Sequence, residues 1–371
     1  MSTHLRSPLK SSRFINMCVS NWFLHIYVYS LIPLLYAQAK QFGCGAGLVG
    51  WAIVAFAIGM ILPGPFGAHL MECRSRKEVF LKSLLVLGFL PTLGYVWANE
   101  GYQLVLLHAL QGVAFGVAQT ALGTTLVNDV LASKQRNKGD VIYAWVGRLG
   151  IPLGPVVGML LTYFFGLQQA YWWSLTACFM AFLLVGQTQI PLKAPVKVPL
   201  LTFDRFFIPK TLPLSLTLFI APWMIGRALG LQLSLWFYLV VFAGFLFLFI
   251  ARWLAHVFSS SQWVPALGYL LLFSTIVVYC FSDTLITAFM VGLGASLIAS
   301  THLKVWVTSA DHCQRGTAQN TYMLSWRIAF SLGFLYSVYA PSHAYVLDLT
   351  ILLICALAYY LNPSRYAVKS E

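Results

Sequence analysis

The chain has 371 residues, of which 59% are hydrophobic and only 9% are charged, whereas about a quarter of the residues are charged in soluble domains. The mean hydropathy is +0.78. Because so few charges cannot cover a water-soluble surface, the composition excludes a soluble enzyme, a disordered chain and a disulfide-bonded scaffold. It indicates a polytopic, all-α membrane protein.

The net charge of +13 would suit a nucleic-acid partner. The positions of the basic residues, given below, favour a membrane topology signal instead. The seven cysteines are scattered and form no C-x-x-C pair, which indicates reduced, small apolar residues and no metal site. We expect neither a cofactor nor a nucleic-acid partner.

Apolar segments long enough to cross about 30 Å of hydrocarbon, roughly 20 residues each, predict twelve spans. The first six cover residues 15–37, 46–70, 79–98, 102–127, 141–165 and 168–187. The second six cover residues 211–230, 233–255, 262–282, 284–308, 317–340 and 343–361. Between the two groups, residues 188–210 contain four prolines (Pro191, Pro195, Pro199 and Pro209) and predict a linker. The linker divides the chain into six-helix halves, 1–187 and 211–371.

The basic residues gather on one side of this arrangement. Of the 23 Lys and Arg residues, 19 fall on the side of the two termini, and Lys40 falls on the other side. The remaining three, Arg148, Arg227 and Arg327, lie within spans. Because basic loops are retained in the cytoplasm, we expect both termini to be cytoplasmic, in a cell (inner) membrane.

An internal repeat relates two segments at an offset of 179 residues. Six of twenty aligned positions are identical, namely Gln135/Gln314, Arg136/Arg315, Tyr143/Tyr322, Arg148/Arg327, Leu153/Leu332 and Gly154/Gly333. A repeat separated by six spans keeps its orientation in the membrane, so the sequence predicts parallel halves related by an axis along the membrane normal.

Three motifs follow in chain order. Residues 64–80, GPFGAHLMECRSRKEVF, place Glu72 before a basic cluster, between the second and third spans. The fourth span contains HALQGVAFG from His108, and the fifth contains GIPLGPVVG from Gly150. In these motifs the chain resembles the major facilitator superfamily. GIPLGPVVG is similar to the pattern of that family's antiporter branch, and His108 stands where the family usually has arginine.

The fifth-span motif also has a direct physical consequence. Gly150, Gly154 and Gly158 recur at every fourth residue, so they share one helix face and allow another helix to approach closely. Pro152 and Pro155 remove backbone donors and are expected to bend this helix. Tight packing follows from these residues, whereas an exchange function is only implied by the resemblance.

The resemblance implies two parallel halves that work by alternating access, with spans 1, 4, 7 and 10 lining a central cavity. It also implies that Glu72 faces the start of span 11, near Thr317, and that Arg76 pairs with Asp129. These contacts would stabilise the outward-open state. Lys77 belongs to the basic cluster of the same motif. A solvated loop charge is the alternative for Glu72.

Ionisable groups at bilayer depth are costly and usually face a cavity or a partner. The first and fourth spans each carry a set of polar residues (Asn21, His25 and Tyr29; His108, Gln111 and Gln119). The resemblance implies that both sets face the cavity. His25 is the candidate for the main titrating group, because histidine titrates near neutral pH and midspan carboxylates are absent. A core histidine bonded to a neighbouring helix is the alternative.

Arg148 and Arg327 occupy equivalent positions and either extend to the cytoplasmic interface or form an inner gate. Arg227 is expected to meet substrate or the outer headgroups, and Asp348 is expected to be an interfacial residue. No Asp or Glu lies in the middle of spans 1, 4, 5, 7, 8, 10 or 11. This absence disfavours a lipophilic cation and favours a neutral or anionic solute.

The sequence therefore predicts a monomeric secondary transporter that moves a small solute by alternating access, with proton-coupled efflux as the leading form. The alternative within this class is an uptake symporter or a uniporter for a sugar-like or anionic solute. An alternative of another class is a transport-inactive membrane sensor. An enzyme is disfavoured, because the sequence has no H-E-x-x-H, G-x-S-x-G or P-loop motif and no midplane carboxylate pair.

Overall fold

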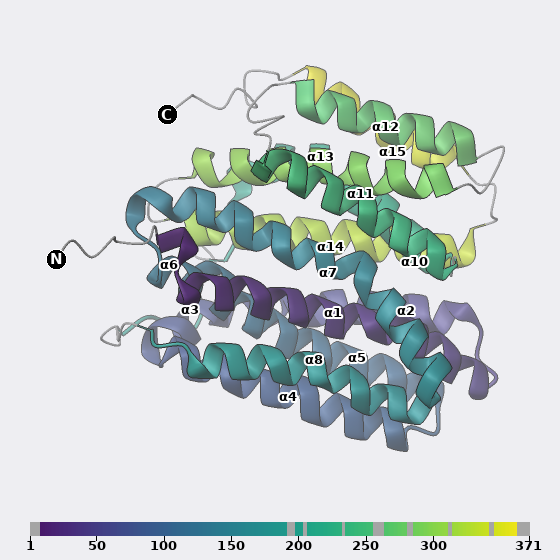
Figure 1. Ribbon diagram of the computed structural model, residues 1–371, viewed down its shortest axis with the longest axis horizontal. Helices are drawn as coiled ribbons and strands as arrows, with labels where there is room; N and C mark the ends of the chain where they lie inside the picture. Colours follow the sequence, from purple (N-terminus) through teal and green to yellow (C-terminus); the bar gives the residue numbers. More distant parts are fainter. Residues whose placement is uncertain are drawn as a thin grey trace.

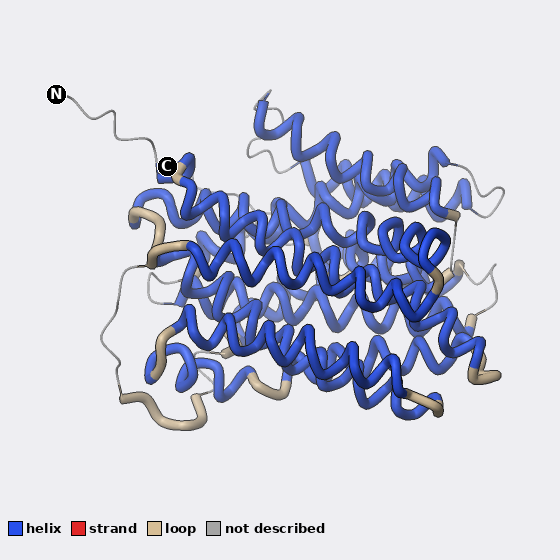
Figure 2. The backbone as a smooth tube through the Cα atoms, turned by 60° about the horizontal axis from the view of Figure 1, so that its bottom comes forward, coloured by secondary structure: helices blue, strands red, loops and turns tan. Residues whose placement is uncertain are grey.

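A computed structural model describes residues 8–190, 197–202, 206–231, 234–254, 263–279, 285–310, 314–340 and 345–361. The described chain consists of helices joined by short loops, and it contains no strand (Figure 2). Some residues used above to assign topology and the linker lie outside the described residues (Arg6, Lys193, Arg205, Arg365, Lys369, Pro191 and Pro195).

The first half contains eight helices, of which α6 is a single turn. They are α1 (Ser12–Gln41), α2 (Ala46–Ile61), α3 (Gly64–Cys73), α4 (Arg76–Trp97), α5 (Gly101–Gln119), α6 (Val127–Asp129), α7 (Arg136–Phe165) and α8 (Leu167–Gln187). A π-helical segment, η2 (Thr120–Leu126), joins α5 to α6. Gly43 and Gly166 follow α1 and α7 with φ of 67° and 79°, a backbone conformation that glycine adopts without strain at helix ends.

The second half begins with a broken pair of helices, α9 (Leu212–Leu218) and α10 (Ile220–Gly230), which meet at an angle of 51°. The helices that follow are α11 (Leu235–Leu254), α12 (Trp263–Tyr279), α13 (Leu285–Ser309), α14 (Arg315–Tyr339) and α15 (Val346–Tyr360). Over the residues that the structure describes, each of the twelve predicted spans falls on one helix or on one interrupted helix of this series.

The two halves use the same packing pattern. In the first half α1 packs against α7 and α2 against α5, and in the second half α10 packs against α14 and α11 against α13. The halves meet where α2 packs against α14 and α7 against α11. In Figure 1 the first half fills the lower part of the view and the second half the upper part. The chain therefore folds as two repeated helical halves, and the site described below lies between them.

The bundle has two distinct ends (Figure 1). We call the end where α1 begins and α15 ends the linker end, because residues 197–202 and 206–208 pack there, and the opposite end the far end. By length and apolarity, eight described helices can cross a membrane, or nine with the bent pair, while α12 and α15 are shorter apolar helices. The number of helices that cross therefore stays a prediction.

Candidate functional site

The centre of the interface holds a polar cluster built from α1 and α14. His25 and Tyr29 lie one turn apart on α1, and both are buried. Nδ1 of His25 lies 2.8 Å from the carbonyl oxygen of Asn21, which can only accept, so this nitrogen carries the proton. The free Nε2 then accepts from Nη2 of Arg327 at 3.3 Å, and the Tyr29 hydroxyl accepts from Nη1 of the same guanidinium. Arg327 thus joins the two halves.

Arg148 on α7 makes the equivalent connection in the opposite direction. Its Nη2 donates to the hydroxyl of Tyr322 on α14, which itself donates to the carbonyl oxygen of Ala299 at 3.1 Å. The guanidinium also lies 5.0 Å and 5.2 Å from the ring centres of Tyr322 and Trp326, within cation–π range. The repeat-related arginines therefore each donate to a tyrosine of the other half.

Neither arginine extends to a membrane interface. Arg148 is 4% exposed and Arg327 is 3% exposed, so the alternative that they snorkel is wrong. The physical reason is that α7 and α14 turn these positions toward the opposite half, where tyrosine hydroxyls and aromatic rings receive the guanidinium groups. Their predicted role as an inner gate remains a proposal.

The central cluster carries positive charge that no carboxylate offsets. Within the described chain, neither Arg148 nor Arg327 forms an ion pair with Asp or Glu. Nη1 of Arg148 and Nε of Arg327 are buried and have no hydrogen-bond partner among the described residues. Because a buried charge without a counter-ion is costly, this arrangement is suited to receive an anion.

The other predicted polar residues form two networks beside the cluster. Gln119 donates to Asn21 Oδ1 at 2.9 Å and accepts from the Tyr143 hydroxyl at 3.2 Å, and Asn21 donates to the Tyr143 carbonyl oxygen at 3.0 Å. In the second network the Tyr95 hydroxyl bridges Nδ1 of His108, at 2.8 Å, and Oε1 of Gln111, at 3.2 Å. The two predicted stripes therefore lie in the interior, but His108 bonds within its own half.

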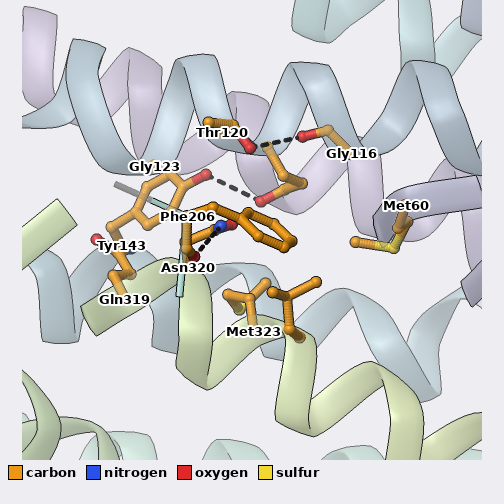
Figure 3. A pocket seen from close by; sticks show the side chains of 11 residues that line it. Met60, Gly116, Thr120, Gly123, Tyr143, Phe206, Gln319, Asn320 and Met323 are labelled. Carbon is orange, nitrogen blue, oxygen red and sulfur yellow. Dashed lines mark hydrogen bonds between the residues drawn. The ribbon is translucent and has the colours of Figure 1, made fainter. Parts of the chain in front are cut away.

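Two small cavities flank the cluster. One is lined by Tyr29, His108 and Arg327 together with apolar side chains, and has a volume of about 20 Å³. The other lies toward the linker end, also with about 20 Å³, and Figure 3 shows the ring of Phe206 in its middle. Each volume suffices for about one water molecule, so this conformation is closed around the cluster.

Phe206 reaches this second cavity from the linker. Its ring packs so closely on α3 that a Cβ at Gly64 would lie 1.8 Å from it, and its carbonyl oxygen accepts from Asn320 on α14 at 3.0 Å. Sequence reasoning missed this residue, because one aromatic residue in a proline-rich linker gives no signal of where it packs. Phe206 therefore connects the halves at the linker end.

Arg227 and Asp348 differ from their predicted roles. They form an ion pair of 2.5 Å, with side chains only 5% and 1% exposed, between α10 and α15. Trp223 also donates to Asp348 at 2.8 Å. The Arg227 guanidinium is thus paired inside the bundle, and the Asp348 side chain is buried against α10 and not exposed. The reason is that α15 turns its acidic residue toward α10, where the arginine neutralises it.

The loop motif forms a charged network at the linker end. Nη1 of Arg76 donates to both carboxylate oxygens of Asp129, at 3.0 Å and 2.8 Å, and Nη2 donates to Glu72 at 3.1 Å. Lys77 donates to the carbonyl oxygens of Gly186 and Thr188 at the end of α8. The expected ion pair of Arg76 with Asp129 is therefore present, and its effect on the conformational equilibrium remains a proposal.

The three glycines of the fifth span pack directly on α1. A Cβ added at Gly150 would lie 2.7 Å from Cβ of His25, and one at Gly154 would lie 2.4 Å from Cβ of Tyr29. At Gly158 it would lie 2.1 Å from a backbone oxygen of α1. The predicted close approach is confirmed, and α7 continues unbroken through Pro152 and Pro155. This face of α7 therefore holds the two cluster residues of α1 in place.

The family model of the Major Facilitator Superfamily matches residues 17–210, about half of the chain. Among curated proteins, the MFS transporter paaT of Penicillium rubens is 27% identical over 42% of this chain. Citrate exporter 1 of Aspergillus niger is 24% identical over 38%. These matches span only 28% and 26% of the relatives' own lengths.

Two solved structures share the fold over nearly the whole chain. The human organic anion transporter MFSD10 matches with a TM-score of 0.66 and 16% identity, over 94% of this chain and 98% of that one. A bacterial homologue of the human lysosomal transporter Spinster, inward-facing and unoccupied, matches with a TM-score of 0.67 and 14% identity, over 96% and 98%. The family match and the repeated halves lead to one conclusion: the chain belongs to the major facilitator superfamily.

Proposed function

We propose that this membrane transporter moves a small organic anion by alternating access, with the halves 1–187 and 211–371 moving about the central cluster. The observation that carries this proposal is the pair of buried guanidinium groups, Arg148 and Arg327, which no carboxylate neutralises within the described chain. A neutral sugar would leave both charges uncompensated, and a cation would be repelled. An anion gives the cluster its counter-ion.

We propose that His25 couples proton binding to transport. Its Nε2 accepts from Arg327, so a proton on Nε2 would remove that hydrogen bond and place a second cation beside the guanidinium. An anion bound at Arg327 would offset this added charge. Proton and anion therefore favour each other's binding, and net flux follows the combined gradients.

Export from the cytoplasm is the direction we propose, with the linker end facing the cytoplasm as the basic loops indicate. Arg252 and Lys304 lie between the linker end and the cluster, and Arg252 on α11 donates at 3.4 Å to Thr301 on α13, three residues before Lys304. Such a line of positive charge concentrates anions on that side. The citrate exporter named among the relatives agrees with this direction. The second candidate is uptake by proton symport, because the proton on His25 and the anion at Arg327 favour each other's binding and would then be carried together.

The test is flux through the purified chain in proteoliposomes of known orientation. Labelled carboxylates, a neutral sugar and an organic cation would be compared, with a pH gradient of either sign and without one. We expect carboxylate flux, stimulated by the gradient, and no flux of the cation. Flux of the sugar in preference to every anion would contradict the proposal, and the sign of the effective gradient separates export from uptake.

A matched pair of histidine variants tests the proton step. His302 on α13 bonds the carbonyl oxygen four residues earlier, as His25 does, but its Nε2 lies 2.9 Å from the Thr217 hydroxyl, where that of His25 faces Arg327. His25→Gln is expected to retain carboxylate exchange and lose stimulation by the pH gradient, while His302→Gln retains both. A His25→Gln variant with unchanged stimulation would exclude His25 from coupling.

A further inference from the structure

We propose that the transported solute carries two separate anionic groups, one for Arg148 and one for Arg327. The inference rests on the proposed anion transport. It is more specific, because it identifies the solute as a dicarboxylate-like dianion that is bound at two separate sites.

The two guanidinium groups lie in separate environments. Arg148 stacks on the rings of Trp145, Tyr322 and Trp326 at 5.0–5.9 Å, and Arg327 lies 5.2 Å and 4.9 Å from the ring centres of Tyr29 and Phe115. Among the described residues they share no aromatic partner. Each therefore forms its own subsite, with rings on one side and its unpartnered nitrogen available on another.

The repeat explains why there are two such subsites. Arg148 and Arg327 occupy equivalent positions of the fifth and eleventh spans, and each is held by a tyrosine of the opposite half. The two arginines lie in the same region of the interface, since Arg148 lies 5.2 Å from the ring centre of Trp326, the residue that precedes Arg327. A Cβ at Gly147, the residue before Arg148, would lie 3.1 Å from the ring of His25, which accepts from Arg327. We infer that one small solute reaches both subsites, because both lie at this interface beside residues that are neighbours in sequence.

Charge balance then selects the class of solute. A planar guanidinium binds a carboxylate through two parallel hydrogen bonds. A solute with one carboxylate neutralises one arginine and leaves the other buried without a counter-ion, whereas a solute with a carboxylate at each end neutralises both. A single compact dianion, such as sulfate, supplies the charge but cannot contact two separate subsites equally well.

The experiment measures binding to the purified full-length chain in nanodiscs through the intrinsic fluorescence of tryptophan, because Trp145 and Trp326 stack on Arg148. The probes are succinate, butyrate of the same chain length, and sulfate. We expect succinate to bind about tenfold tighter than butyrate or sulfate. Equal affinities for succinate and butyrate, or for succinate and sulfate, in the unchanged chain would overturn two-point binding without requiring any variant.

Variants locate the two points. Arg148→Gln and Arg327→Gln are each expected to reduce succinate affinity to that of butyrate, while butyrate affinity changes by less than about threefold, because one arginine remains. Lys40→Gln removes a basic residue of the far end and serves as the charge control. Should either glutamine variant misfold, Arg148→Lys and Arg327→Lys keep the charge and lose the planar fork, and a smaller loss of succinate preference is expected. An unchanged preference in every variant overturns the inference.

The outcomes separate this inference from the proposed function. Carboxylate flux with equal affinity for succinate and butyrate leaves anion transport intact and refutes the dianion. Absence of both carboxylate binding and carboxylate flux refutes anion transport itself.

Discussion

Replacing Gly154 by alanine is expected to force α1 and α7 apart and to remove most of the transport activity while the chain still folds. An added Cβ would lie 2.4 Å from Cβ of Tyr29 and 2.9 Å from the backbone nitrogen of Ser30. Carbon atoms in contact lie about 3.5 Å apart or more, so the helices must separate by roughly 1 Å at this point. A backbone atom cannot turn aside as the end of a flexible side chain can.

This displacement has two consequences of different size. Overpacking of a close-packed interior costs about 1–3 kcal/mol, which a folded protein usually tolerates. The hydrogen bond of Arg327 to the Tyr29 hydroxyl is more sensitive, because a shift of roughly 1 Å takes donor and acceptor out of range. Misplacement on this scale lowers function by about tenfold or more in preorganised sites.

Gly186→Ala on α8 is the matched control, because an added Cβ there meets nothing within 4 Å. Both variants would be compared with the parent chain by thermal melting and by carboxylate flux in proteoliposomes. We expect Gly154→Ala to melt at a lower temperature and to lose most of its flux, and Gly186→Ala to keep both. Full flux in Gly154→Ala would refute the claim that close packing of α1 on α7 sets the position of Tyr29.

Three further changes test other contacts. Asp348→Asn removes the carboxylate that pairs with the buried Arg227 guanidinium, so we expect a loss of about 3–5 kcal/mol in the free energy of unfolding, measured by melting, and an unchanged melting temperature would contradict the pair. Arg76→Ala and Asp129→Asn should each impair flux, and the double variant should be no worse than either, whereas additive losses would exclude direct pairing. Arg252→Gln should raise the KM for an anion at the linker end, with a difference that shrinks as salt rises; a salt-independent KM would rule out steering.

The helices and their repeat follow from sequence because burial in lipid demands long apolar segments, and such segments stand out in any hydropathy scan. The equivalence of Arg148 and Arg327 is also visible in the sequence, as part of six identities in the repeat. Tyr322, the partner of Arg148, belongs to the same set of identities, so the repeat carried a signal for this residue that sequence reasoning did not use.

The Arg227–Asp348 pair shows what sequence leaves undetermined. Hydropathy gives the depth of a residue in the membrane, but it does not give the direction in which a helix turns its side chains. Both residues lie toward one end of their spans, where contact with headgroups is the ordinary expectation. Only the packing of α15 against α10 turns the acid inward, and this long-range contact has no local pattern.

In the closed conformation the arginine–tyrosine bonds lie at the centre of an interface that is also held at both ends. At the far end Tyr36 donates to the Gly230 carbonyl oxygen at 3.0 Å, and at the linker end Phe206 connects α3 with α14, so both ends are held across the interface. Opening either end moves the halves and disturbs the arginine–tyrosine bonds at the centre. In the proposed mechanism an anion that binds the guanidinium groups replaces those bonds, because a carboxylate is a stronger acceptor than a tyrosine hydroxyl. We therefore expect the charge of the proposed solute to lower the free-energy cost of the movement that transports it.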